Sequence, residues 1–312
     1  MNIKSSENLK LYGMNIFFDE IIKLYYKKKL PNKILLSGKK GIGKSTFAYH
    51  IINCILSTNE DNKYDQTKLH INKENKSYKL IQNNSHPNFY LIDVSEEKKT
   101  IDISQIRKMI NYSNKSSFNN NPRFVLIDNA ENLNKNSTNA LLKIVEEPNK
   151  NINFILIHNN EKNILPTLKS RCLLFKINFS FNECINIINS LLDDNIFDLI
   201  NNDLISYYNT PGDIINLINF AKEKKINLNE FSLKELLEYL INNSYYKKNK
   251  LVKSLLINFI ELYFLKEYNK SSSKKSLLYI YHLFLDKIHN TEKFNLDEES
   301  LFLEFKMKLL NG

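Results

Sequence analysis

The chain has 312 residues, 42% of them hydrophobic and 12% aromatic, which is enough apolar material for a buried core and for more than one domain. This composition excludes a chain that is disordered throughout. Its 44 lysine and arginine residues outnumber its 34 aspartate and glutamate residues, and the net charge of +10 favours an anionic partner without identifying it. No apolar run has the length of a bilayer span, and the opening MNIKSSENLK lacks the apolar region of a signal peptide. The sequence therefore predicts a cytoplasmic protein with no membrane partner.

The first quarter of the chain has the pattern of a helix, a strand, a loop and a second helix. Residues 14–29 carry apolar side chains at helical spacing, and Pro31 then ends the predicted helix. An apolar run at residues 34–36 predicts a buried strand, and helical periodicity resumes after SGKKGIGKST and continues to about Leu56. Residues 57–84 are polar and weakly periodic, so we expect a surface insertion there, in part helical and poorly ordered, rather than a domain.

Strands and helices alternate over the next hundred residues. Apolar runs predict four further strands, at residues 89–94, 123–128, 153–158 and 173–177. Helical patterns lie between them, at residues 103–112, 137–147 and 165–169, and we expect Pro148 to stop the second of these helices. Five strands separated by helices are typical of a doubly wound α/β domain with a parallel five-stranded sheet.

From Ser180 onward the pattern is helical only. Three short helices are predicted first, in ECINIINSLL, IFDLINNDLISYY and GDIINLINFAK. After Leu228 the predicted helices are longer and amphipathic. We therefore predict domain boundaries near residues 178 and 225, and hence three domains, which comprise residues 1–178, 179–224 and 225–312.

The strongest chemical signal is a glycine-rich loop. Three of only six glycines fall within the octet GKKGIGKS at residues 38–45. The octet fits G-x-x-x-x-G-K-[ST] without a mismatch and lies between a predicted strand and a predicted helix, which is the context of a phosphate-binding loop. In such a loop the backbone N–H groups and the helix N-terminus face the phosphates, the lysine reaches the terminal phosphates and the hydroxyl ligates Mg²⁺. The predicted nucleotide-binding residues are Gly38, Gly41, Gly43, Lys44, Ser45 and Thr46; the alternative is a chance turn rich in glycine and lysine.

An acidic residue follows the apolar strand RFVLI. Asp128 stands where a P-loop NTPase places the aspartate that holds the Mg²⁺ shell together with Ser45, although aspartate is also common at strand-end turns. P-loop enzymes that hydrolyse ATP need a base to activate water, but the residue after Asp128 is Asn129, and an amide does not accept the proton. Glu131 follows two positions later. Hydrolysis in this chain's own site is therefore predicted to be weak or absent.

Longer motifs occur at residues 139–148, NALLKIVEEP, and at residues 165–172, LPTLKSRC. Together with the opening at residues 11–51, SHPN at 85–88 and IDISQIR at 101–107, they resemble the AAA+ proteins of bacterial DNA polymerase III clamp loaders, most closely the delta-prime class. The resemblance covers about residues 10–220, and beyond them only the helical character agrees. It implies an α/β AAA+ P-loop domain with a parallel five-stranded sheet, then a small helical lid domain and an all-α C-terminal collar domain for oligomerisation.

The same resemblance assigns roles to two residues. Ser170-Arg171-Cys172 matches the family's SRC motif, whose arginine reaches across a subunit interface to ATP bound by the neighbour. A planar, permanently charged guanidinium suits the charge that develops on a transferring γ-phosphoryl group. The alternative is a surface arginine at a helix end. Asn159 matches the sensor-1 position, which contacts phosphate or water, and its alternative is an ordinary strand-end asparagine.

The chain departs from the family pattern in two places. Related subunits often carry a four-cysteine zinc module, whereas only Cys54 lies in that region here and the other cysteines are Cys172 and Cys184, so no zinc is predicted. Gly212 stands where motor subunits place a sensor-2 arginine. The resemblance thus implies a stator that lends Arg171 to a neighbouring ATPase, with ATP or ADP and Mg²⁺ in its own intact loop.

The resemblance also implies partners: clamp-loader subunits of the delta and gamma/tau types in a hetero-oligomer, and the sliding clamp and primed DNA through that assembly. Two other hypotheses stay open. One is an active ATP-hydrolysing motor subunit in which Glu131 serves as the base. The other is an unrelated P-loop nucleotide-binding enzyme such as a small-molecule kinase, which leaves the SRC motif unexplained. No nucleic-acid-binding motif is visible, so any DNA contact is expected to be independent of sequence.

Overall fold

The computed structural model describes residues 4–95, 98–114, 121–146, 151–271, 273–294 and 296–310. The chain divides into two compact units. The first comprises Met1–Leu191 together with Thr210–Gly212, and the second comprises Leu192–Asn209 together with Asp213–Gly312. The finer division into three domains at residues 178 and 225 stays a prediction.

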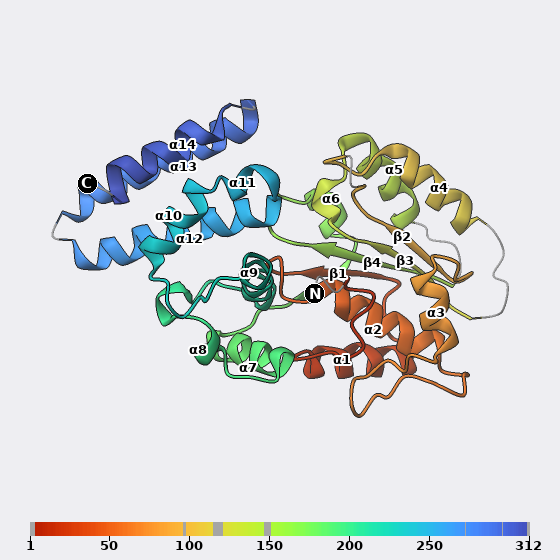
Figure 1. Ribbon diagram of the computed structural model, residues 1–312. Helices are drawn as coiled ribbons and strands as arrows, with labels where there is room; N and C mark the ends of the chain where they lie inside the picture. Colours follow the sequence, from red (N-terminus) through yellow and green to blue (C-terminus); the bar gives the residue numbers. More distant parts are fainter. Residues whose placement is uncertain are drawn as a thin grey trace. The chain divides into compact units, whose positions relative to one another are not determined.

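A parallel five-stranded sheet runs through the first unit (Figure 1). Its strands are β1 (Lys33–Ser37), β2 (Phe89–Ile92), β3 (Arg123–Ile127), β4 (Ile152–His158) and β5 (Leu173–Lys176). They lie in the order β2-β3-β4-β1-β5, and every neighbouring pair is parallel. The predicted fold class, a P-loop α/β domain with this sheet followed by helices, is confirmed.

Each strand contains a run of apolar residues because its side chains enter two separate cores, one on each face of the sheet. In β1, Ile34 and Leu36 belong to the core on one face of the sheet, whereas Leu35 belongs to the core on the other face. The same alternation holds in β3, where Phe124 and Val125 point into different cores. A sheet that is covered on both faces therefore produces the continuous apolar runs from which the strands were predicted.

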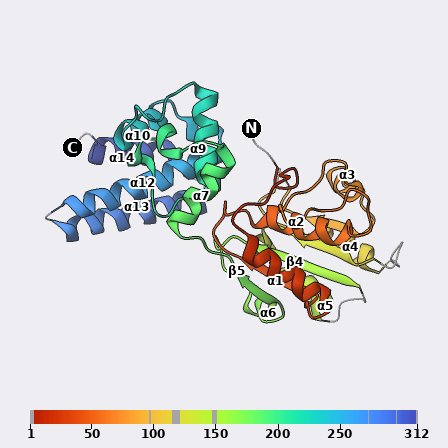
Figure 2. The ribbon, with the colours of Figure 1, turned by 90° about the horizontal axis from the view of Figure 1, so that it is seen from below.

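Helices cover both faces of the sheet (Figures 1 and 2). On one face lie α1 (Asn15–Tyr26), α2 (Lys44–Leu56) and α3 (Lys76–Gln82). On the other face lie α4 (Ile103–Ser113), α5 (Lys135–Glu146) and α6 (Pro166–Lys169). The first unit also contains the short helix η1 (Ala130–Asn132) and nearly all of α7 (Phe181–Leu192). Helix α5 ends at Glu146, and Pro148, which was expected to stop it, lies outside the described residues.

The segment between α2 and β2 differs from the predicted poorly ordered surface insertion. Tyr64, Leu69 and Ile71 are buried and belong to the same core as α1 and α2. The Glu60 carboxylate accepts hydrogen bonds from the backbone N–H and the hydroxyl of Ser77, and so supports the first turn of α3. Helix α3 confirms that the segment is in part helical. The expected poor order was wrong, because a few apolar residues that anchor the segment to the core give almost no periodic signal in a polar stretch.

The second unit is helical in the part of the chain that the structure describes. Its elements are α8 (Ile196–Leu199), η2 (Asn202–Leu204), α9 (Pro211–Lys224, whose first two residues belong to the first unit), α10 (Leu233–Asn242), α11 (Tyr245–Lys248), α12 (Lys250–Lys270), α13 (Lys274–Phe294), α14 (Glu298–Phe305) and η3 (Lys306–Leu310). Phe264, Phe284 and Phe305 join α12, α13 and α14 through ring centroids 5.4 to 6.0 Å apart. Among the described helices none has both the length and the apolar character needed to cross a membrane.

Replacing Ile71 with alanine tests whether the segment between α2 and β2 is part of the core. Ile71 is 1% exposed, so truncation should lower the free energy of unfolding by about 2–5 kcal/mol, because it removes buried methylene groups and leaves a cavity. Urea denaturation of the whole chain measures the change. The control is Ile16→Ala, at a side chain that is 81% exposed, which should cost less than about 0.5 kcal/mol. Equally small effects of both variants would contradict the burial of this segment.

Candidate functional site

The glycine-rich loop joins β1 to α2 at the carboxyl edge of the sheet. Gly41 and Gly43 adopt φ angles of +83° and +91°, in the left-handed region that glycine enters without steric cost. The loop then leads directly into α2, whose first residue is Lys44. The N-terminal N–H groups of this helix are therefore available to an anion held by the loop.

Lys44 is folded into the loop. Its Nζ donates hydrogen bonds to the carbonyl oxygens of Gly38, at 3.0 Å, and Lys39, at 2.6 Å, and the residue is only 3% exposed. Burial lowers the pKa of Lys44 to about 8, although the carboxylates of Asp128 and Glu131 act in the opposite direction. The lysine thus carries a proton that it loses more readily than an exposed lysine does.

Ser45 and Asp128 meet directly. The Ser45 hydroxyl donates to Asp128 Oδ2 at 2.7 Å, which joins the start of α2 to the end of β3. Burial raises the pKa of Asp128, and the hydrogen bond from Ser45 opposes this rise. Mg²⁺ prefers oxygen ligands and is usually held by one or two protein groups together with phosphates. The adjacent hydroxyl and carboxylate fit that requirement.

Thr46 is the last of the predicted loop residues. Its hydroxyl accepts a hydrogen bond from Asn8 Nδ2 at 3.2 Å. The carbonyl oxygen of Asn8 in turn lies 3.0 Å from Nε2 of His50, which is fully buried in α2. The segment that precedes α1 is therefore anchored beside the loop, an arrangement that the sequence reasoning did not identify.

A chain of carboxylates and amides continues along the same edge of the sheet. Asn129 donates from Nδ2 to Asp93 Oδ1 at 2.7 Å, and its Oδ1 accepts from Asn159 Nδ2 at 2.8 Å. The backbone N–H of Asn159 points to Glu131 Oε2 at 3.3 Å. Asn159, predicted to stand at the sensor-1 position, and Asn129, which follows Asp128 where a base was expected, are thus hydrogen-bonded to each other through their side-chain amides.

Two carboxylates in this network matter for the chemistry. Glu131 is 8% exposed, and its Oε1 is buried with no hydrogen-bond partner among the described residues. Asp93, which follows β2, was not identified as a site residue from the sequence. Because β2 pairs with β3 in parallel, the residues that follow the two strands lie at the same edge of the sheet. An aspartate directly after the apolar run of β2 was the sequence signal that could have identified Asp93.

Gly212 lies against the loop. Its backbone N–H donates to the carbonyl oxygen of Gly41 at 2.9 Å. A β-carbon on Gly212 would lie 2.7 Å from the Gly41 Cα atom, and one on Gly41 would lie 2.3 Å from the Thr210 hydroxyl. The position where motor subunits are expected to carry an arginine is therefore filled by a contact between two backbones.

Arg171 is the one predicted site residue that lies away from the loop. The loop follows β1, whereas Arg171 precedes β5, and the two strands are parallel with Ile34 opposite Leu173. Arg171 therefore lies at the amino edge of the sheet, on the order of 20 Å from the loop at about 3.3 Å per residue. Its guanidinium pairs with Glu146 Oε1 at 2.6 Å and donates to the Thr167 carbonyl oxygen at 2.8 Å.

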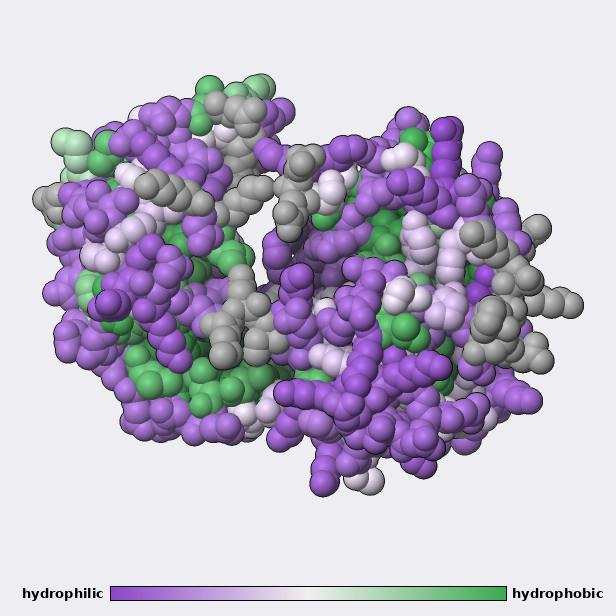
Figure 3. Space-filling model, turned by 45° about the vertical axis from the view of Figure 1, so that its right-hand side comes forward, coloured by the Kyte–Doolittle hydropathy of each residue, from purple (hydrophilic) through white to green (hydrophobic). Residues whose placement is uncertain are grey.

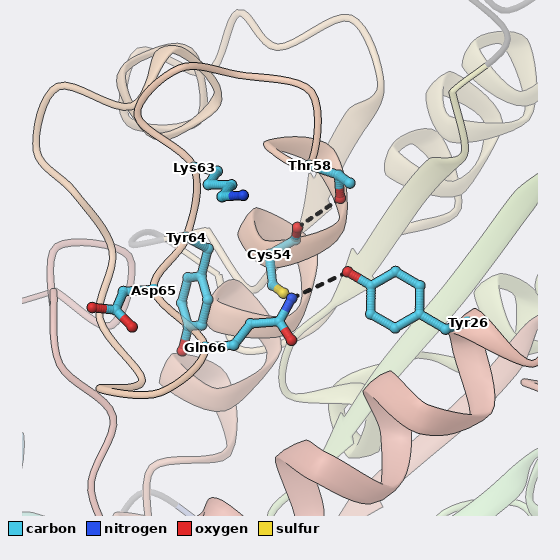
Figure 4. Close-up of a pocket in the computed structure, with 7 residues that line it drawn as sticks. All are labelled: Tyr26, Cys54, Thr58, Lys63, Tyr64, Asp65 and Gln66. Atoms are coloured by element: carbon cyan, nitrogen blue, oxygen red, sulfur yellow. Dashed lines mark hydrogen bonds between the residues drawn. The ribbon is translucent and has the colours of Figure 1, made fainter.

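The region of Cys54 holds a separate cavity of about 450 Å³. Figure 4 shows Gln66 between Cys54 and Tyr26, with its Nε2 donating to the Tyr26 hydroxyl at 3.1 Å. Burial raises the pKa of the Cys54 thiol to about 12, which keeps it protonated near neutral pH. In the part of the chain that the structure describes, no three His, Cys, Asp or Glu side chains are grouped closely enough to hold a metal ion.

Comparison with known proteins identifies relatives. A family model described as DNA polymerase III, delta subunit, matches residues 14–180. A DNA polymerase III subunit delta' of Buchnera aphidicola subsp. Schizaphis graminum is 29% identical over 51% of this chain and 47% of its own length. The delta' subunit of Buchnera aphidicola subsp. Baizongia pistaciae is 27% identical over 87% of this chain and 76% of its own length. A DNA polymerase III subunit gamma of Buchnera aphidicola subsp. Schizaphis graminum is 32% identical over 74% of this chain and 62% of its own length.

These matches confirm the resemblance to the delta-prime class that the motifs indicated. The matched range 14–180 contains the glycine-rich loop, Asp128, Asn159 and Arg171. The chain spans about half the length of the first delta' relative.

Binding of ADP should weaken as the pH rises above about 8. Free Lys44 loses its proton in that range, whereas a bound phosphate favours the ammonium, so binding takes up a proton. The affinity should therefore fall by up to about tenfold per pH unit above pH 8. Calorimetric titration of the isolated chain with ADP at several pH values measures the effect. Lys44→Arg, which keeps its charge, is the control, and a wild-type affinity that stays constant over this range would contradict contact between Lys44 and phosphate.

Proposed function

Since this chain belongs to the family described as DNA polymerase III, delta subunit, we propose that it is a clamp-loader subunit that helps to place the sliding clamp on primed DNA. Within that assembly it acts as a delta-prime-like stator: it donates a cation to a neighbouring ATPase and hydrolyses little ATP itself. The delta' and gamma relatives support a place in a clamp loader.

One observation carries the proposal that Arg171 acts on a neighbour. Arg171 and the glycine-rich loop lie at opposite edges of one parallel sheet, so the guanidinium does not reach a phosphate held by its own chain. The side chain is nevertheless exposed to solvent over 36% of its surface and is therefore accessible to another subunit. A guanidinium presented in this way stabilises the charge that develops during phosphoryl transfer in a neighbouring site.

The chain's own site suits nucleotide binding better than turnover. The backbone of Gly38–Ser45 would hold the phosphates of ATP or ADP with Lys44, and Ser45 and Asp128 would hold Mg²⁺, which supplies charge neutralisation at the phosphates when it is bound. Turnover also needs a base. Asn129 is an amide that is hydrogen-bonded on both sides, to Asp93 and Asn159, and offers no base for water.

The second unit has the surface of a helical region that takes part in assembly. Along α13 the side chains of Leu278, Tyr279 and Leu283 are 42%, 65% and 44% exposed. Figure 3 shows groups of hydrophobic side chains on a face of the molecule that is otherwise mostly hydrophilic. Exposed apolar residues at this density favour contact with other subunits, for which we propose the delta and gamma/tau types. The net charge of +10 favours sequence-independent contact with DNA phosphates.

The alternative is an active motor subunit, and one observation favours it. Glu131 Oε1 is buried without a hydrogen-bond partner among the described residues, while the other oxygen of this carboxylate faces Asn159. A buried carboxylate with a free acceptor oxygen has the chemistry of a general base. The gamma relative, at 32% identity, is consistent with this alternative as well.

Turnover by the isolated chain separates the two functions. The stator should bind ADP yet hydrolyse ATP at least about 100-fold more slowly than the assembled loader, because a missing positioned base costs about 10²–10⁴ in rate. Single-turnover hydrolysis of radiolabelled ATP measures the rate. Fast turnover that disappears in Glu131→Gln but not in the control Glu74→Gln would instead establish the motor.

Arg171→Ala tests the trans role in the loader that co-purifies with this chain. Loss of an arginine finger should slow hydrolysis at the neighbouring site by about a thousandfold or more, so the loader loses that site's share of DNA-stimulated turnover. Arg171→Lys should restore little of the lost hydrolysis rate, because a lysine ammonium lacks the planar pair of N–H donors with which a guanidinium binds phosphate oxygens. Lys169→Ala, at an exposed position two residues earlier, is the matched control. Unchanged turnover in Arg171→Ala, with the assembly intact by gel filtration, would refute the trans role.

A further inference from the structure

We propose that Glu146 is a positioning residue for Arg171: it holds the guanidinium in an ion pair that a neighbour's phosphate has to displace. This inference rests on the trans role of Arg171 proposed above. It adds a regulating partner within the same chain, so that the exposed cation is neutralised until a triphosphate arrives.

The guanidinium is held from two sides by two helices. Glu146 is the last residue of α5, and its Oε1 lies 2.6 Å from one terminal nitrogen of Arg171. The other terminal nitrogen donates to the carbonyl oxygen of Thr167 in α6 at 2.8 Å. These two acceptors engage two of the five N–H donors of a guanidinium. The contact with the Thr167 carbonyl can persist while Glu146 is exchanged for a phosphate oxygen.

The ion pair between Arg171 and Glu146 is weak enough for a phosphate to displace Glu146. The side chains of Arg171 and Glu146 are 36% and 48% exposed, so water screens their attraction. A triphosphate carries several negative charges against one on Glu146, and its oxygens can replace Glu146 Oε1 as acceptor for the same terminal nitrogen of Arg171. The pair therefore orients Arg171 in the free chain and gives way to ATP on the neighbouring subunit.

Removal of the Glu146 charge should therefore favour engagement of Arg171. In Glu146→Gln the competitor is weaker while the Thr167 contact stays, so the neighbour's site should reach half-saturation at about threefold lower ATP. The maximal rate should stay unchanged, because at saturating ATP Arg171 has already left Glu146 in both proteins. A change in KM without a change in kcat distinguishes this role from a structural one.

The scarcity of arginine makes the ion pair itself measurable. The chain has only Arg107, Arg123 and Arg171, so labelling with ¹⁵N-arginine gives three guanidinium Nε–Hε signals, and Arg171→Lys identifies one of them. In the isolated full chain, Glu146→Gln should shift the Arg171 signal and speed its hydrogen exchange. Glu74→Gln, which removes a comparable exposed pair with Lys79, should leave that signal in place. An Arg171 signal that is identical in Glu146→Gln and in the wild type would overturn the proposal.

ATP turnover by the assembled loader, measured against ATP concentration with primed DNA, supplies the second readout. We expect a lower KM in Glu146→Gln, and no effect of this change once Arg171→Ala is present. If Arg171→Ala slows turnover but Glu146→Gln leaves KM unchanged, the positioning role fails and the trans role stands. If Arg171→Ala has no effect, the trans role itself fails, even where the ion pair is seen by NMR.

Discussion

All five strands of the sheet run in one direction, and this constraint divides the chemistry of the chain between two edges. Loops that leave the carboxyl ends of the strands bring together Lys44, Ser45, Asp128 and Asn159, whereas the loop that enters β5 carries Arg171 at the opposite edge. Strands of this length keep the edges on the order of 15–20 Å apart, which no side chain spans. For this reason the guanidinium of Arg171 does not reach a phosphate held in the chain's own loop.

The charged residues at the two edges of the sheet differ in burial, and this difference fits the separate roles that we propose for them. Lys44 is almost completely buried, and burial brings its pKa down to about 8, so its charge depends on what the loop holds. The guanidinium of Arg171, by contrast, lies at the surface in a solvent-screened pair with Glu146. Between them, the amide of Asn129 takes part in a hydrogen-bonded network instead of acting on water. A buried lysine suits retention of a ligand in the chain's own loop, whereas an exposed guanidinium is accessible to an anionic group on another subunit.

Much of this arrangement was predictable because it is encoded locally. Apolar runs predicted every strand, and the glycine spacing together with its strand and helix predicted both the loop and its neighbour Asp128. The contacts of Asn129 with Asp93 and of Glu146 with Arg171 were not predictable, since each depends on which elements lie side by side and both acids are ordinary surface residue types. The burial of Ile71 was not predicted for a related reason. An isolated apolar residue in a polar stretch has no periodic pattern of apolar neighbours that would indicate whether its side chain faces the core.

The backbone contact between Gly41 and Gly212 has a consequence for how such a chain changes over evolutionary time. Gly212 has no room for a β-carbon while the Gly41 backbone keeps its place, and Gly41 has none while the Thr210 hydroxyl keeps its place. An arginine at residue 212 would therefore require a prior rearrangement of the phosphate loop, which would harm ligand binding before the new side chain brought any gain. A single substitution of Gly212 therefore disturbs the phosphate loop before the new side chain can act there, so this position and the loop have to change together.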